Sequence, residues 1–208
     1  AKYEGILAGF NWSHEFNSQW KLQHRAYVQS TTEDDQNAIP LTLQADNQTL
    51  DRFFAGFQGN KHKTYTTSLD LTGHFDALGA KHTLLVGGDY YHFKNTATLV
   101  DNFAFPAIDI LNPVHGGSPT RDPADDFGLD LKENWFGLYL QDQVELPFHL
   151  HLLAGLRYDN AEKSNTSTFG GVQTSKTSRQ DKVTPRVGLL WQPIKELAFY
   201  GNYVEGFG

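Results

Sequence analysis

Cysteine is absent from the 208 residues of this sequence. The chain therefore has neither a disulfide framework nor a thiolate metal site. Because an exported protein can also lack cysteine, this absence does not indicate the cellular compartment. No unbroken apolar stretch comes near the roughly 18 residues that a membrane-spanning helix needs, so such a helix is excluded. The mean hydropathy of −0.49 agrees with this. The net charge is −7 and the basic residues are scattered, which argues against nucleic acid as a partner.

Motifs of enzyme active sites are also lacking. There is no G-x-S-x-G nucleophile elbow. His149 and His151 could present two imidazoles on one strand face as a zinc site does, but no third ligand is recognisably linked to them. Four carboxylates without the spacing of an EF-hand are interpreted as an acidic, solvated loop: Asp122, Asp125, Asp126 and Asp130. The sequence therefore predicts that the chain is not an enzyme and holds no metal of its own.

Aromatic residues and glycine are abundant instead, with 15 Phe, 9 Tyr and 19 Gly. This composition favours strands and turns over helices. The segment WFGLYLQDQVELPFHLHLLAGLRYDN, residues 135–160, alternates apolar and polar residues twice, on either side of Pro147-Phe148. Successive strand side chains point to opposite faces, so each half has one apolar face and one polar face.

The same alternation recurs along the chain, and helical spacing is not sustained anywhere. It predicts eight long antiparallel strands, at residues 3–13, 20–30, 64–75, 81–93, 133–146, 149–160, 182–192 and 196–205. The connections alternate between short ones (14–19, 76–80, 147–148 and 193–195) and long ones (31–63, 94–132 and 161–181). Outer-membrane barrels have this asymmetry, with short periplasmic turns and long extracellular loops. Residues 50–58 also look extended, and we place them above the membrane as an extension of strand 64–75.

A soluble β-sandwich also alternates between an inner and an outer face. Three features favour an all-β, antiparallel transmembrane barrel. The runs, about 10 to 14 residues, exceed the usual 5–6. The apolar face bears aromatics near strand ends, as interfacial girdles do: Trp12, Trp20, Tyr65, Tyr90, Tyr158 and Trp191. The opposite face is polar, as a hydrated lumen is: Arg25, Asp70, Asp89, Gln141, Gln143, Glu145, Arg157 and Arg186.

Four motifs follow one another along the chain. TLDRFFAGFQGNKHKTYTTSLDLTGHF precedes KHTLLVGGDYYHF, which leads into AIDILNPVHGG. GLYLQDQVEL is followed by LHLLAGLRYDN, and TPRVGLLWQP by LAFYGNYVEGF. Together they resemble the barrel of TonB-dependent siderophore receptors of the Gram-negative outer membrane, in particular hydroxamate-type receptors such as the ferrichrome receptor. The resemblance covers nearly the whole chain in collinear order.

This resemblance implies a barrel of about 22 strands with a plugged lumen. It also implies uptake of ferric siderophores with energy relayed by TonB through the plug domain. Eight strands cannot close such a barrel, and no plug and no closing strand ending in an aromatic are recognised. We therefore expect residues 1–208 to be an internal part of the barrel domain, from a larger protein or a processed product. A porin-like passive channel and a soluble β-rich binding module are the alternatives.

The resemblance also implies where a ligand would bind. Iron would arrive as a ferric siderophore chelate, so the receptor needs no cofactor, only concave walls of aromatic and polar groups. Aromatic residues near the extracellular ends of the strands and in the loops are the candidates for the barrel mouth: Tyr91, Phe93, Trp135, Phe53, Phe54, Phe57, Phe103 and Phe105. The first three have the parity of the polar, lumen face. The simpler alternative is that these side chains pack the loops together. The outer face would contact outer-membrane lipid.

Overall fold

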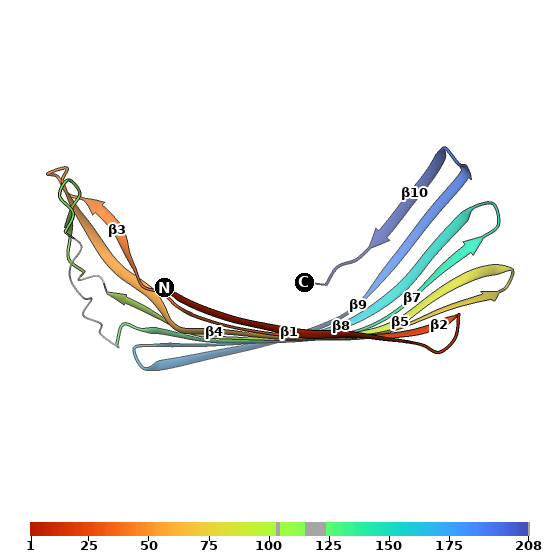
Figure 1. Cartoon of the computed structure of the whole chain (residues 1–208), viewed down its shortest axis with the longest axis horizontal. Helices are drawn as coiled ribbons and strands as arrows, with labels where there is room; N and C mark the ends of the chain where they lie inside the picture. The colour runs from red at the N-terminus through yellow and green to blue at the C-terminus, as the bar shows by residue number, and fades with distance from the viewer. Residues whose placement is uncertain (103–104, 115–123, 208) are drawn as a thin grey trace.

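The computed structural model describes residues 1–102, 105–114 and 124–207. Their strands form one antiparallel sheet that curves into an open arc with a concave and a convex side (Figure 1). The described residues contain no helix, and hence none long and apolar enough to cross a membrane.

Eight long strands follow one another across the sheet: β1 (Lys2–Glu15), β2 (Trp20–Asp34), β4 (Thr49–Ala77), β5 (Ala80–Asn102), β7 (Phe127–Leu146), β8 (Leu150–Phe169), β9 (Val172–Ile194) and β10 (Leu197–Val204). Each pairs with the next, and two short strands, β3 (Asn37–Leu43) and β6 (Ile108–Asp109), pair with β4. Among the described residues β1 and β10 do not pair with each other, so the sheet stays open. The eight predicted strands are confirmed in number, order and direction.

The short connections all lie at one end of the sheet, on the right in Figure 1. They comprise residues 16–19, 78–79, 147–149 and 195–196. In the first, the Asn17 side chain accepts hydrogen bonds from the backbone N–H groups of Gln19 and Trp20, at 2.8 and 2.9 Å. In the second, Leu78 and Gly79 both have positive φ, of 51° and 78°, as a two-residue hairpin turn of type I′ requires. The predicted short turns are therefore confirmed.

The prediction that residues 94–132 and 161–181 are long loops is wrong in extent, because the strands continue into them. β8 and β9 stay paired as far as a turn at Gly170 and Gly171, whose φ values are 56° and 75°. β5 runs on to Asn102 and β7 begins at Phe127. Both faces of the β8–β9 extension are polar, so the alternation that identifies a strand disappears there while the backbone ladder persists.

Residues 50–58 belong to β4, as predicted, and continue it above a β-bulge. The bulge lies between Gln58 and Lys61, where Gly59 has a φ of 61°. The Gly59 N–H donates to the Asp34 carboxylate at 2.6 Å. Above the bulge β4 bends toward the concave side (Figure 1), as bulged strands do.

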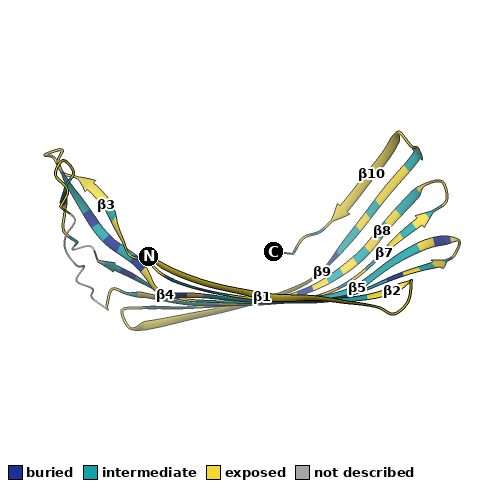
Figure 2. Cartoon of the chain, in the orientation of Figure 1, coloured by how far each residue is buried: buried dark blue, intermediate teal, exposed yellow. Residues whose placement is uncertain are grey.

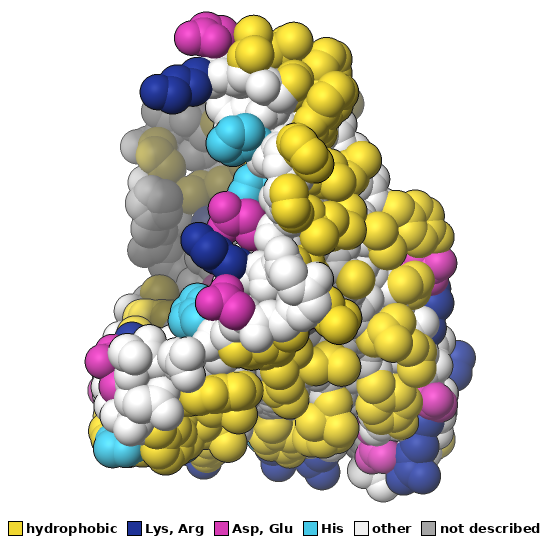
Figure 3. Space-filling view, turned by 90° about the vertical axis from the view of Figure 1, so that its right-hand side faces the viewer, with side chains coloured by type: hydrophobic (Ala, Val, Ile, Leu, Met, Phe, Trp, Pro, Cys, Tyr) yellow, Lys and Arg dark blue, Asp and Glu magenta, His cyan; other side chains and the backbone are white. Residues whose placement is uncertain are grey.

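The two faces of the sheet differ in polarity. Leu138, Leu140 and Leu156 lie on the convex face and are 50%, 50% and 54% exposed. Figure 3 shows hydrophobic side chains gathered on the outer side and charged ones along the inner side. Most of the sheet is exposed or half-buried, with buried residues concentrated in the upper part of β4 (Figure 2). A single curved layer with this much exposed apolar surface requires an apolar surrounding, which a membrane supplies.

Candidate functional site

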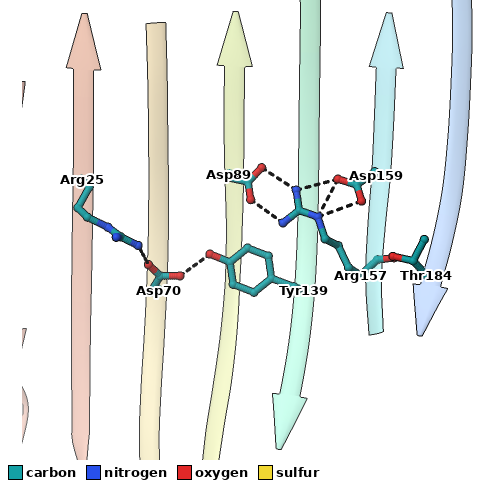
Figure 4. Close-up of polar contacts among 7 residues, drawn as sticks. All are labelled: Arg25, Asp70, Asp89, Tyr139, Arg157, Asp159 and Thr184. Carbon is teal, nitrogen blue, oxygen red and sulfur yellow. Dashed lines mark hydrogen bonds and ion pairs between the residues drawn. The ribbon is translucent and has the colours of Figure 1, made fainter. Parts of the chain in front are cut away.

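A chain of polar side chains crosses the concave face (Figure 4). It begins on β2, where the Arg25 guanidinium donates to one oxygen of the Asp70 carboxylate on β4, at 2.7 Å. The other oxygen of Asp70 accepts a hydrogen bond from the Tyr139 hydroxyl on β7. Asp70 is only 8% exposed. Burying a carboxylate without hydrogen-bond partners costs free energy, and the hydrogen bonds from Arg25 and Tyr139 offset this cost for Asp70.

Arg157 of β8 forms the centre of the second half of this network. Its two Nη atoms donate to both oxygens of Asp89 on β5, at 2.7 and 2.9 Å. Its Nε donates to both oxygens of Asp159, at 2.8 and 2.9 Å. The Arg157 guanidinium carbon lies 5.4 Å from the centre of the Tyr139 ring, and this cation-π contact joins the two halves. One guanidinium between two carboxylates leaves this half with a negative charge.

Two glycines allow the network to lie flat on the sheet. A β-carbon on Gly137 would come within 2.2 Å of Arg157 Nη2 and 2.9 Å of Asp89 Oδ1. A β-carbon on Gly87 would come within 2.5 Å of the Tyr139 ring. Larger residues at these positions would push the polar side chains away from the strands, so glycine keeps the space above the network free.

Tyr91 and Trp135 lie above the network on the same concave face. They are direct cross-strand partners on β5 and β7. Each is two residues along its strand from the row that holds Asp89 and Gly137, a distance of roughly 7 Å. Phe93 continues upward from Tyr91, and its ring centre is 6.0 Å from that of His62. The sheet thus brings the first three predicted mouth residues together, and their contact with a ligand stays a prediction.

A hollow of about 280 Å³ lies beside Trp135 on the concave face. Its lining includes Trp135, Arg157, Asp159, Arg186, Glu205 and Phe207. The rings of Phe207 and Trp135 meet edge to face with their centres 5.5 Å apart. The hollow therefore offers an aromatic side and a charged side to whatever enters it.

The phenylalanines of upper β4 divide between the two faces. Phe57 pairs with Leu99, which has the parity of Tyr91 and Phe93, so Phe57 lies on their face. Phe53 has the parity of Phe57. These two therefore continue the aromatic surface upward.

Phe54 has the opposite parity and packs within the loop region instead. It is 7% exposed, and its ring centre lies 5.9 Å from that of Phe105. The Arg52 guanidinium covers the same Phe105 ring at 4.8 Å and donates twice to the Pro106 carbonyl, at 2.8 and 3.0 Å. For Phe54 and Phe105 the loop-packing alternative is thus the better interpretation. Phe103 lies outside the described residues.

The remaining polar residues of the predicted lumen face lie lower on the strands. Arg186 Nη1 donates to the Gln141 side-chain oxygen at 3.2 Å. Gln143 and Glu145 line a second hollow, of about 540 Å³, near the short turns. A concave face that carries these polar groups below the aromatic residues agrees with a hydrated lumen.

The weak metal motifs do not assemble. His149 lies in the turn before β8 with a φ of 57°, while His151 is within β8, so the two do not share a strand as the zinc interpretation assumed. Asp122 lies outside the described residues. Within the described ranges no group of three or more His, Cys, Asp or Glu residues could hold a metal ion.

Three members of the network, Tyr139, Asp159 and Thr184, were not among the predicted lumen residues. Tyr139 and Asp159 have the lumen parity of Gln141 and Arg157, so a systematic count of parity would have found both. The Thr184 hydroxyl approaches the Arg157 carbonyl at 3.5 Å. The role of Gly137 had no signal in the sequence, because it depends on a side chain of the neighbouring strand.

Comparisons with known proteins agree with this architecture. Residues 2–208 match the family model described as "TonB dependent receptor-like, beta-barrel". The chain is 30% identical over 207 residues to the metal-pseudopaline receptor CntO of Pseudomonas aeruginosa, covering 93% of this chain and 28% of the receptor. It is 30% identical over 208 residues to the ferrioxamine B receptor of Salmonella typhimurium, covering 97% of this chain and 28% of that receptor.

Solved structures show the same fold. The ferric-catecholate import receptor Fiu of E. coli K12, in its closed form, superposes with a TM-score of 0.78 at 19% identity, over 97% of this chain and 32% of that one. The unliganded ferric citrate transporter FecA gives a TM-score of 0.70 at 13% identity, over 96% of this chain and 27% of that one. The chain thus spans under a third of the length of these relatives. It belongs to the TonB-dependent receptor β-barrel family, whose members lie in the outer membrane of Gram-negative bacteria.

Proposed function

We propose that this chain is part of the barrel of an outer-membrane receptor that takes up ferric siderophores with energy from TonB. The observation that carries the proposal is the aromatic pair Tyr91–Trp135 directly above a fixed polar network on the concave face. A ferric siderophore encloses its metal in its own ligands and presents an outer surface of methylene and amide groups. Aromatic faces and a few oriented polar groups suit such a surface, and a metal-binding cluster is unnecessary.

Two of the relatives support a particular class of ligand. One is named a ferrioxamine B receptor and another a ferrichrome outer membrane transporter. Both ligands are hydroxamate chelates, so we propose a hydroxamate-type ferric chelate for this receptor. TonB would act through a plug domain elsewhere in the full-length protein.

The test compares the full-length receptor with its Tyr91→Ala/Trp135→Ala variant, using ferrioxamine B and ferrichrome as ligands. Each aromatic contact contributes about 0.5–1.5 kcal/mol beyond area burial. The double change should weaken binding by roughly tenfold to a hundredfold. A matched control is Tyr65→Ala/Tyr90→Ala, which removes two aromatics from the convex face and should leave affinity unchanged. Normal binding by a correctly inserted Tyr91/Trp135 variant would place the ligand site elsewhere.

Uptake by cells separates the receptor from a passive channel. Transport by a TonB-dependent receptor stops when TonB is deleted, whereas a porin-like channel continues to conduct. Transport of radiolabelled ferric chelate at equal rates with and without TonB would therefore favour the porin alternative.

A further inference from the structure

Above the mouth of the barrel, the polarity of the two faces of β5 and β7 is inverted. In the lower part of β7 the convex face is apolar and the concave face polar, as at Leu140 and Gln141. In the upper part the convex face carries Asp130 and Lys132, an ion pair at 3.6 Å, whereas the concave face is mainly apolar. We call the six apolar concave residues of this part the apolar track: Phe93, Ala97, Leu99, Phe127, Leu129 and Leu131.

The apolar track is continuous across the two strands and long. Its residues share one parity, and at the upper end Leu99 and Phe127 are direct cross-strand partners. Between the row of Tyr91 and the row of Leu99 the strand advances eight residues, roughly 26 Å. Beyond Leu99 and Phe127, the same row continues to Phe57 of β4 and Phe169 of β8, which are 39% and 59% exposed. The track therefore leads from the mouth residues to the tip of the wall.

Membrane lipid does not account for an apolar surface in this place. The track is on the concave face, and the convex face at the same height is polar, so this part of the wall stands in water. Polar residues flank the track, with His62 and Thr64 on β4 and Asn165 and Ser167 on β8. Phe127 itself is 38% exposed. An apolar surface of this extent in water, bordered by polar groups, is typical of a binding site.

The charge and hydrogen bonding of the track indicate what kind of group binds there. Two polar residues interrupt it, and neither adds a net charge: Asn95 is neutral, and the Glu133 carboxylate pairs with the Lys163 ammonium at 2.8 Å. The backbone groups of β5 and β7 are already paired with each other in the ladder. A peptide would leave its own N–H and C=O groups without partners on such a surface, whereas a hydrocarbon chain has none to satisfy.

We propose that the apolar track binds a hydrocarbon chain attached to the ferric siderophore, so that the receptor prefers acylated hydroxamate chelates. This inference rests on the proposed function, because it assumes that the chelate itself lies against Tyr91 and Trp135. A chain that leaves the chelate at this pair runs upward along β5 and β7. Its methylene groups and the track then remove each other's apolar surface from water, which favours binding.

The experiment uses the full-length receptor in lipid nanodiscs, and empty nanodiscs measure how far each probe partitions into lipid. The two probes are N-acetyl-ferrioxamine B and N-hexanoyl-ferrioxamine B, both loaded with radioactive iron. Both are uncharged, and they differ only in the length of the acyl chain. The parent receptor should bind the hexanoyl probe about tenfold or more tightly than the acetyl probe, because the additional methylene groups leave water.

Three variants locate this preference on the track. Leu129→Ser/Leu131→Ser should abolish it and leave the affinity for the acetyl probe within about twofold of the parent. Leu129→Met/Leu131→Met keeps the track apolar and should retain the preference, which separates lost recognition from misfolding. The control, Leu41→Ser/Leu43→Ser, makes the same change at two exposed leucines of β3, outside the track, and should also retain it.

The outcomes distinguish this inference from the proposed function. If the parent binds both probes with equal affinity, the inference is overturned and the hydroxamate receptor stands. A preference no larger than the partition into empty nanodiscs has the same meaning, as does a preference that persists in the double serine variant. If the parent binds neither probe, the proposed function fails and this inference fails with it.

Discussion

The lower and upper halves of the long strands share one hydrogen-bond ladder but differ in side chains. β7 and β8 are paired without interruption from Leu146–Leu150 to Phe127–Phe169. In the lower half, convex partners are apolar, as in Leu140–Leu156. In the upper half the same face presents Lys132–Ser164. The backbone thus fixes the ladder, whereas the medium on each face fixes the side chains.

The polar contacts of the two halves differ as well. In the lower half they join five strands through buried and half-buried groups, with Arg157 held between two carboxylates. In the β8–β9 hairpin they are local and exposed, as in Thr166–Ser175 at 2.9 Å. Exposed pairs contribute little because water competes for them. Substitutions in the lower half should therefore reduce the stability of the protein more than substitutions in the upper half.

The largest expected effect comes from a charge on the lipid-facing side of the lower half. Leu140→Arg should destabilise the full-length receptor by about 2–4 kcal/mol, because an arginine near the bilayer midplane is poorly solvated. Gln141→Arg, the next residue but on the concave face, should cost much less. Ser167→Arg in the upper half should change stability by no more than about 0.5 kcal/mol. Urea unfolding of the receptor in lipid vesicles measures all three. Equal penalties for Leu140→Arg and Gln141→Arg would contradict the assignment of faces.

A smaller effect is expected within the polar network. Gly137→Ala places a methyl group where Arg157 Nη2 lies and should cost about 1–3 kcal/mol, the usual range for overpacking. Gly201→Ala is the matched control, since its β-carbon would meet no heavy atom within 4 Å. Urea unfolding in lipid vesicles measures the stability of both variants. If both glycine variants are equally stable, Arg157 moves aside freely and the network is not rigid.

Sequence alone predicted the lower half well. Alternation at residues 133–146 and 149–160 identified both the strands and their faces, because one side meets lipid and the other water. The same reasoning placed Arg25, Asp70 and Arg157 on one face. Its success depends on two different media, and where both faces meet water, as at residues 161–181, it predicted a loop instead of a hairpin.

The candidate site was harder to predict because it depends on register and packing. Tyr91 and Trp135 share parity, but their direct pairing follows from where the turns fall. Phe53 and Phe54 are adjacent in the sequence and lie on opposite faces, and only the contact with Phe105 shows that Phe54 packs the loop. The bulge at Gly59 shifts parity by one residue, which no alternation count reveals.

A local effect is expected at the tip of the β8–β9 hairpin. Gly171 has a φ of 75°, in the region that costs other residues roughly 1–2 kcal/mol. Gly171→Val should open the hairpin locally and speed hydrogen exchange of backbone amides in residues 164–177. Global stability should hardly change, because the hairpin lies above the membrane. Gln173→Val, at an ordinary strand position, is the control. Slow exchange in both variants would mean that the turn tolerates a side chain there.

The smallest expected effect concerns the turn between β3 and β4. The Asp46 carboxylate accepts hydrogen bonds from the Thr49 hydroxyl at 2.6 Å and from the backbone N–H groups of Thr49 and Gln48, at 2.8 and 2.9 Å. These hydrogen bonds lower the pKa of Asp46 below its ordinary value of 3.8, and the bond from the Thr49 hydroxyl contributes most. Because the pKa is lower in the folded state, the contribution to turn stability is complete above pH 3.8 and disappears as the pH falls through the lowered pKa.

Titration of the Thr49 amide chemical shift in micelles should therefore have its midpoint below 3.8. Thr49→Val removes the hydroxyl and should move the midpoint of the residue 49 amide upward, toward that value. The polar network is far from this turn, so the variant should leave urea unfolding unchanged. If the midpoint stays where it is in the parent, the hydroxyl does not hold the carboxylate, and the turn is fixed by its backbone hydrogen bonds alone.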